Sequence, residues 1–253
     1  MSEASTPELV GSHRTATGTA APSSPTLRRA FLGVALGAAA IVLWGFWPTY
    51  LEPLLHGGVD RIWLIHLHAV VFFGWILILT LQASLVARGR VAWHRRVGLA
   101  GAAYGTLVFC MGVAVGIGAP AAHVVAGEQQ IDVAWIVVIY NLTDIMIFGG
   151  FFAAAMMFRR QADRHRRLIV SATVALAGAA VGRVLPGGTL QYFLVWLLPL
   201  FAVIGIDVWT RPRPHVVSLL SLGIFMLEFF KVPLFAGSTL WTGLGRMLLR
   251  PFV

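Results

Sequence analysis

The chain has 253 residues, of which 58% are hydrophobic and only 11% are charged. A typical soluble domain carries about 25% charged residues, so ten acidic and nineteen basic side chains are too few to cover a soluble globule of this length. The composition excludes a soluble enzyme, a disordered protein and a disulfide-rich secreted module. It predicts an all-α membrane protein, with the lipid bilayer as its main partner.

The formal net charge of +9 would suggest nucleic-acid binding in a soluble chain. Here most of the basic residues lie in short runs between apolar segments, which is the distribution that cytoplasmic loops of membrane proteins require. We therefore expect no nucleic-acid partner.

The first 27 residues are rich in Ser, Thr, Ala and Pro, which predicts a disordered tail over 1–27. Arg28 and Arg29 follow immediately before an apolar stretch. A twin-arginine export signal has this form, but two arginines also hold the start of a first spanning helix in the cytoplasm. Because further apolar segments follow, we favour the second interpretation and place the tail in the cytoplasm.

Seven apolar segments between residues 28 and 236 are long enough to span a bilayer, which takes about 20 residues. They lie at 30–49, 62–87, 97–119, 132–158, 167–185, 190–209 and 216–236. The connections between them are short, so we predict one seven-helix transmembrane bundle over 28–236.

The connections alternate in charge. The second, fourth and sixth segments are each followed by arginines, namely Arg88, Arg90, Arg95, Arg96, Arg159, Arg160, Arg164, Arg166, Arg167, Arg211 and Arg213. The other connections carry most of the acidic loop residues, namely Glu52, Asp60, Glu128 and Asp132. The positive-inside rule therefore predicts a cytoplasmic N-terminus and an external C-terminus.

The last stretch, 237–253, is too short and too interrupted to span. Apolar residues recur there at helical spacing with two arginines among them: Leu240, Trp241, Leu244, Arg246, Met247, Leu248 and Arg250. This pattern predicts an amphipathic helix in the outer membrane interface.

Small residues suggest which spans lie in the middle of the bundle. Four GxxxG pairs occur, all on the first, third and fifth segments: Gly33/Gly37, Gly101/Gly105, Gly112/Gly116 and Gly178/Gly182. Such pairs let helix backbones approach closely in lipid, so we place these three segments centrally.

Ionisable groups inside a bilayer are costly and mark candidate functional sites. Counted at about 1.5 Å per residue, four charged groups of zero net charge fall in the outer half: Asp144, Arg183, Glu228 and Lys231. Glu228 and Lys231 are three residues apart, so they share a helix face and can pair. The inner half holds little that is comparable besides Gln82.

Three neutral polar residues, His66, His68 and Asn141, fall at the same outer level as the four charges. We predict that all seven line an outward-facing pocket that binds a small polar or anionic ligand or an ion, for transport, sensing or an accessory role rather than catalysis. Structural ion pairs and hydrogen bonds between helices are the alternative. Whether the site holds a metal stays open, because His66 and His68 point in opposite directions on a helix.

Three segments together resemble an uncharacterised group of bacterial polytopic membrane proteins. They are Ile65-His66-Leu67-His68-Ala69 continuing to Gln82, Arg88 and Gly89; Trp93-His94-Arg95-Arg96-Val97-Gly98; and His165-Arg166-Arg167-Leu168 with Arg183. The resemblance covers roughly residues 62–185. It implies a helix bundle in the bacterial cytoplasmic (inner) membrane and supplies no reaction.

The His-Arg pairs that precede helices are also similar to those of dihaem cytochromes of the ascorbate-reducible type. This resemblance implies a b-type haem electron-transfer protein as an alternative, with His68, His94 or His165 as ligands. A structural subunit of a membrane complex, or a homo-oligomer, is the third alternative.

Overall fold

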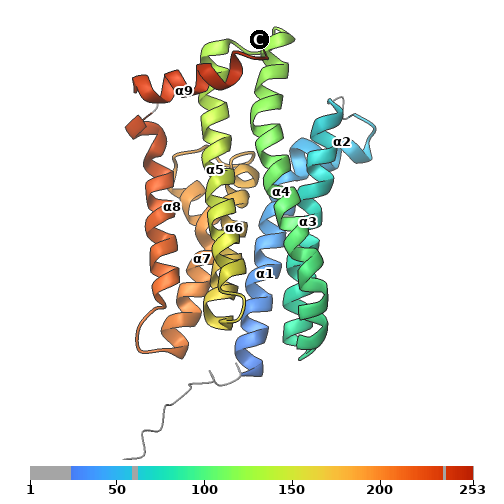
Figure 1. Cartoon of the computed structure of the whole chain (residues 1–253), viewed down its shortest axis with the longest axis vertical. Helices are drawn as coiled ribbons and strands as arrows, with labels where there is room; N and C mark the ends of the chain where they lie inside the picture. The colour runs from blue at the N-terminus through green and yellow to red at the C-terminus, as the bar shows by residue number, and fades with distance from the viewer. Residues whose placement is uncertain (1–23, 59–61, 236–237, 253) are drawn as a thin grey trace, which may run out of the picture.

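The structure is a computed structural model that describes residues 24–58, 62–235 and 238–252, with only the backbone described for Asp132 and 232–235. Within these ranges the regular structure is entirely helical (Figure 1). The elements are α1 (Pro25–Phe46), a π-helical turn η1 (Trp47–Leu51), α2 (Glu52–Leu55), α3 (Trp63–Ala87), α4 (Val91–Val125), α5 (Ile131–Met157), α6 (Ala162–Val181), α7 (Leu190–Thr210), α8 (Val216–Phe235) and α9 (Thr239–Leu249).

The first helix begins inside the segment predicted as a tail. Ser24 caps α1, because its hydroxyl accepts a hydrogen bond from the backbone N–H of Leu27 at 3.2 Å, and Pro25 occupies the first helical position. Both are standard signals of a helix start. The rest of the predicted tail, residues 1–23, lies outside the described residues.

Five of the described helical segments are long and apolar enough to cross a membrane. They are Pro25–Leu55, Trp63–Ala87, Val91–Val125, Val133–Met157 and Leu190–Thr210. These lengths and compositions are those of a multi-pass membrane protein. The remaining long helices are α6, which begins with one aspartate, three arginines and one histidine within six positions, and α8, whose last four side chains are not described.

The long helices run alongside one another and share two ends (Figure 1). One end holds the start of α1 and the three connections from α3 to α4, from α5 to α6 and from α7 to α8. The arginine runs of the sequence lie at this end, so we call it the basic end. α9 lies across the opposite end, which we call the α9 end.

α6 lies in the middle of the bundle, where it packs against α1, α5, α7 and α8. Gly178 on α6 faces Tyr192 and Trp196 of α7, so its lack of a side chain makes room for two aromatic rings. The central placement predicted from GxxxG pairs is thus confirmed for α6. It is also confirmed for α1, which packs against α3, α6 and α7, although nothing lies within 4 Å of a Cβ built on Gly33 or Gly37. It is wrong for α4, which packs mainly against α3 and α5 at the side of the bundle.

The predicted C-terminal helix is present as α9. Trp241, Gly245 and Leu249 form its buried face, which packs against α5 beside Trp135. Leu240, Leu244 and Met247 are exposed on the other face. A helix with one face on the bundle and an apolar exposed face suits a membrane interface.

Candidate functional site

Six of the seven residues predicted to line a pocket fall into two separate clusters. The lysine cluster consists of Tyr140, Thr143 and Asp144 of α5 with Glu228 and Lys231 of α8. The histidine cluster consists of Phe46 of α1, Tyr50 of η1, His66 and His68 of α3, and Arg183 just after α6.

Lys231 is the centre of the lysine cluster and is only 4% exposed. Its Nζ donates to Asp144 Oδ1 at 3.0 Å, to the Thr143 hydroxyl at 2.5 Å and to the carboxylate of Glu228. The ammonium also lies 3.7 Å from the centre of the Tyr140 ring and 3.3 Å from the carbonyl oxygen of that residue. The pairing of Glu228 with Lys231, predicted from their spacing, is confirmed.

The positive charge of Lys231 is shared between two carboxylates. With Asp144 and Glu228 both ionised, the cluster carries one excess negative charge, and both side chains are largely buried. An uncompensated charge in an apolar interior is costly, and proteins avoid it by binding a proton or a cation. The lysine cluster therefore has the composition of a site that takes up one positive charge.

The histidine cluster forms where α1 changes from an α-helix to the π-helical turn η1. Pro48 in this turn has no N–H to donate, and π-helical turns are frequent at functional sites. The turn places the Tyr50 hydroxyl 3.0 Å from Nδ1 of His66. The π-helical turn at the end of α1 thus brings Tyr50 into a polar contact with α3.

His68 lies beside Arg183 in the same cluster. The rings of His68 and Phe72 are 4.1 Å apart, and Nδ1 of His68 is buried without a hydrogen-bond partner. The guanidinium of Arg183 lies 4.7 Å from the centre of the Phe46 ring and acts electrostatically on His68. The cluster therefore combines a cation with a buried, unsatisfied imidazole nitrogen.

Asn141, the seventh predicted residue, lies on α5 one turn before Asp144, with its side chain against Gly116 of α4. No three His, Cys, Asp or Glu side chains among the described residues form a group that could hold a metal ion.

Two surface grooves are lined by apolar side chains. One is formed by Leu43, Trp44, Trp47, Pro48 and Val184. It adjoins the histidine cluster, because Trp47 is the residue after Phe46 and Val184 is the residue after Arg183. The other lies between α1 and α7.

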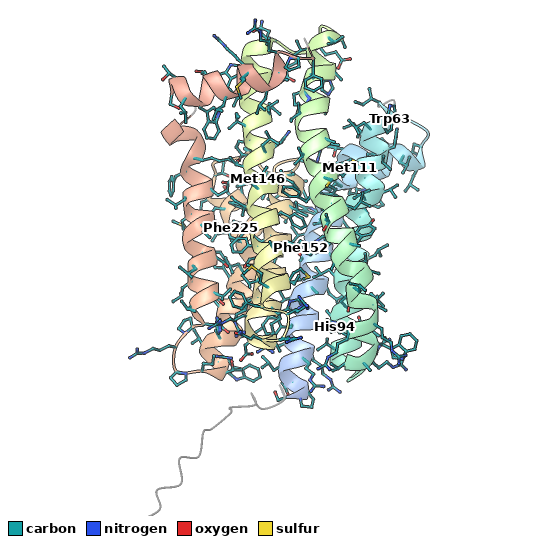
Figure 2. The ribbon with its side chains drawn as sticks, in the orientation of Figure 1. Trp63, His94, Met111, Met146, Phe152 and Phe225 are labelled. Carbon is teal, nitrogen blue, oxygen red and sulfur yellow. The ribbon has the colours of Figure 1, made fainter. Side chains whose placement is uncertain are left out.

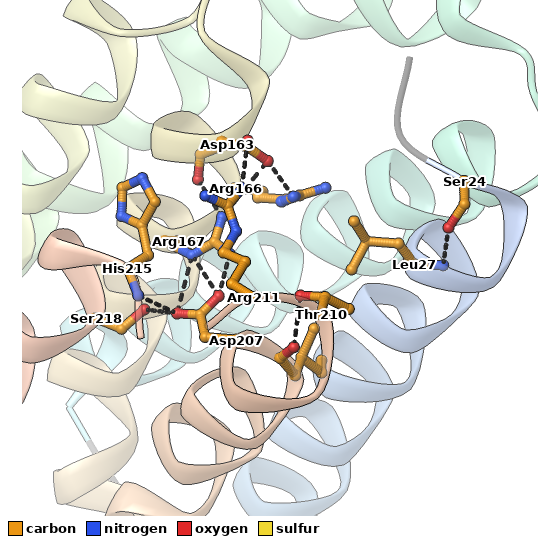
Figure 3. A network of polar contacts seen from close by, with 11 residues as sticks. Ser24, Leu27, Asp163, Arg166, Arg167, Asp207, Thr210, Arg211, His215 and Ser218 are labelled. Atoms are coloured by element: carbon orange, nitrogen blue, oxygen red, sulfur yellow. Dashed lines mark hydrogen bonds and ion pairs between the residues drawn. The ribbon is translucent and has the colours of Figure 1, made fainter. Parts of the chain in front are cut away.

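A third cluster lies at the basic end and was not predicted from the sequence. We call it the arginine network: Asp163, Arg166, Arg167, Asp207, Arg211, His215 and Ser218 (Figure 3). Arg167 and Asp207 are 1% and 0% exposed, and Nε of Arg167 donates to Asp207 Oδ1 at 3.0 Å. Asp207 Oδ2 also accepts from the hydroxyl of Ser218 at 2.6 Å and the backbone N–H of His215 at 3.1 Å. This ion pair joins α6, α7 and the start of α8.

Asp163 completes the arginine network nearer the surface. It pairs with Arg166 and accepts from Nη2 of Arg211 at 2.5 Å. Burial raises the pKa of Asp163, but Arg166, Arg211 and Arg167 outweigh it and hold the pKa below its ordinary value. Burial and the nearby Arg167 and Arg211 lower the pKa of His215.

The arginine network had a signal in the sequence. Asp207 is the one acidic residue of the apolar segment 190–209, and it lies within one turn of a basic loop. An isolated acid at such a depth requires a cationic partner. The arginines of 164–167 looked like membrane anchors because their sequence does not show that Arg167 points into the bundle.

The histidines considered as haem ligands are divided. The rings of His94 and His165 lie 6.4 Å apart at the basic end, and Nδ1 of His165 is 2.9 Å from the carbonyl oxygen of Ala155. His68 lies near the start of α3, and Figure 2 shows His94 near the opposite end of the bundle from Trp63, the first residue of that helix. The structure brings His94 and His165 together and separates them from His68.

Comparisons with family models, with curated proteins and with solved structures each find no match to this chain. The three clusters are therefore the features of the chain that bear on its function.

Proposed function

We propose that this chain is a seven-span protein of the bacterial cytoplasmic membrane that binds a proton at the lysine cluster and a small polar or anionic ligand at the histidine cluster, both from the outer side. It would serve in proton-linked transport or sensing. The observation that carries the proposal is the sharing of Lys231 between Asp144 and Glu228.

The lengths of the helices and the distribution of arginines support this topology. Five described segments have the length and composition of spans, and α6 and α8 run alongside them through the bundle. Most of the arginines, and all of their runs, lie at one end, which favours that end as the cytoplasmic side. With seven spans, α9 and both proposed sites lie toward the outside.

The assignment of the proton to the lysine cluster and of the ligand to the histidine cluster follows from their charges. Lys231 is occupied by two carboxylates, so it is not available to an anionic ligand, and the excess negative charge suits a proton. Arg183 and the unsatisfied Nδ1 of His68 suit the oxygen atoms of an anionic or polar group. Protonation of one cluster and anion binding at the other would change the net charge in opposite directions.

An external pH jump tests the proton site. The protein is reconstituted in vesicles at alkaline pH with a pH indicator confined to the outside, and the rapid uptake of protons after an acid pulse that brings the medium to neutral pH is counted per outward-facing molecule. We expect the wild type to take up one proton more than the Asp144→Asn/Glu228→Gln double variant. The exposed acid Glu128 provides the control, because Glu128→Gln leaves the cluster intact. Equal uptake by wild type and double variant would contradict the proposal.

The ligand site has a separate test. A ligand that binds the folded state raises the unfolding temperature, and the rise grows with the logarithm of its concentration relative to its Kd. We expect acetate or inorganic phosphate to stabilise the wild type and not an Arg183→Gln variant. Arg213→Gln, at the basic end, is the matched control. Stabilisation that survives the loss of Arg183 would remove this residue from the ligand site.

A second candidate function rests on the pair formed by His94 and His165. Two imidazoles that share one metal, each at roughly 2.0–2.1 Å, have ring centres at a separation similar to the 6.4 Å found here. A b-type haem between them would give an absorption band that shifts on reduction, and the His94→Ala and His165→Ala variants would each abolish it. A preparation without such a band would exclude this alternative.

A further inference from the structure

Polar side chains form a row along one face of α8. Ser218, Ser221, Glu228 and Lys231 follow one another at intervals of three or seven residues, and Phe225 occupies the position in the gap. Residues three, four and seven apart lie on the same side of a helix. The row leads from the basic end toward the α9 end and is interrupted at a single aromatic ring.

On the basic side of Phe225, the serines of the row are hydrogen-bonded in two pairs, each with a side chain of a neighbouring helix. The hydroxyl of Ser171 on α6 donates to that of Ser221 at 2.7 Å, and Ser218 donates to Asp207 at 2.6 Å. All four side chains are buried. These hydroxyl groups are more than an apolar helix contact needs, and they extend the arginine network inward.

On the other side of Phe225, the row enters the lysine cluster at Glu228. This carboxylate accepts from Lys231 on α8 and from Thr143 on α5. Lys231 in turn contacts Asp144 and the ring and carbonyl of Tyr140 on α5. A further hydroxyl, that of Tyr192 on α7, is directed to the carbonyl oxygen of Gly178 at 3.4 Å.

Phe225 itself is 0% exposed and fills the space between the two polar halves. Its ring packs 5.6 Å from that of Phe151 and 5.4 Å from that of Trp196, measured between centres. Ser221 and Glu228 are seven residues apart, which is about 10 Å along the helix axis. A proton cannot cross this distance through carbon, so movement of the ring is the condition for water to connect the two halves.

We propose that the face of α8 is a proton route across the membrane, with Phe225 as its gate. A proton leaves the carboxyl group of Glu228 for a water molecule, passes through water and the hydroxyl groups of Ser221 and Ser218, and is released to water at the basic end. Only O–H bonds are exchanged, and no oxidant or reductant is required. This inference rests on the proposed function of the lysine cluster and adds to it a path and a closing element.

The test compares two aromatic truncations in vesicles that contain a pH indicator, with a potassium gradient and valinomycin to balance charge. Phe225→Ala should raise the proton flux several-fold over the wild type. Phe148→Ala is the matched control, because Phe148 is also 0% exposed but packs against Trp75 and Phe152, away from α8. We expect its flux to equal that of the wild type.

The combined variant Phe225→Ala/Glu228→Gln should return the flux to the level of the control, because the open path then lacks its proton donor. If Phe225→Ala does not fold, Phe225→Leu carries the test, with a smaller increase over the control. Equal fluxes for the Phe225 and Phe148 variants would overturn the route.

The two proposals fail in different ways. If the external pH jump shows the extra proton and Phe225 variants do not leak, the proton site stands and the route is wrong. If the extra proton is absent, the proposed function itself is wrong.

Discussion

The lysine cluster and the Arg167–Asp207 pair of the arginine network are both buried groups of charges between helices, but they differ in balance. In the arginine network, Asp207 meets Arg167, a serine hydroxyl and a backbone N–H, so its ionised form is fully satisfied. In the lysine cluster, one ammonium serves two carboxylates. The first arrangement fixes helices in place, and the second leaves a negative charge that must be neutralised from outside the cluster.

This difference in balance distinguishes charges that hold helices together from charges that suit the proposed proton site. A buried ion pair that satisfies its hydrogen bonds is costly to break, because either partner left alone is an uncompensated charge. A cluster with an excess carboxylate can lose one carboxylate charge and become better balanced. Substitutions should therefore have opposite consequences in the two regions.

The largest effect is expected from Arg167→Ala. This change leaves the carboxylate of Asp207 buried without its cation, at a cost of about 3–5 kcal/mol in the free energy of unfolding. Thermal or denaturant unfolding in detergent measures it. A loss below about 1 kcal/mol would show that the buried pair is not structural.

Glu228→Gln should have a much smaller effect on stability. The amide removes the excess charge while Lys231 keeps its bond to Asp144, so we expect a change below about 1 kcal/mol. Proton uptake in the external pH jump should fall at the same time. A large loss of stability with unchanged proton uptake would reverse the roles of the two regions.

The pH dependence of stability reports on the basic end. The pKa of His215 is lower in the folded protein than its ordinary value of about 6.5, so the unfolded chain binds more protons between these two values. Stability therefore rises with pH in this window and is lost as the pH falls below about 6.5. The unfolding temperature of the wild type should drop there more steeply than that of His215→Asn, and parallel curves would contradict this assignment.

Asp163 contributes in the acid range. Its pKa is lowered by Arg166, Arg211 and Arg167 against the effect of burial, so its contribution is present above about pH 4 and is lost as the pH falls further. In the Asp163→Asn variant, the unfolding temperature should fall less steeply than in the wild type as the pH drops below about 4. The same pH dependence in variant and wild type would show that the ion pairs of Asp163 do not contribute to stability.

The smallest effect is expected at the α9 end, where His123 and Glu128 form an exposed pair. Exposed ion pairs contribute little, so Glu128→Gln should change stability by no more than about 0.5 kcal/mol. Unfolding under the same conditions as for Arg167→Ala gives the comparison. An effect as large as that of Arg167→Ala would show that burial does not decide the cost.

Composition and hydropathy predict the helical bundle well, because the length of a span is set by the bilayer and not by neighbouring helices. The pairing of Glu228 with Lys231 follows from local spacing in the same way. The division of the polar residues into two clusters could not be predicted, because it depends on which face of each helix meets which neighbour. Arg167 shows what cannot be predicted from the sequence alone. Its neighbours in the sequence are those of a basic loop, and only the packing of α6 against α7 and α8 makes it the buried partner of Asp207.

The central claim is that the lysine cluster holds a proton. Infrared spectroscopy of the purified protein at neutral pH detects the carbonyl stretch of a protonated carboxyl group and its shift in heavy water. We predict that the wild type shows this band and that the band disappears in the Asp144→Asn/Glu228→Gln variant while it persists in Asp163→Asn. A wild-type spectrum without the band, or a band that survives in the double variant, would contradict the account.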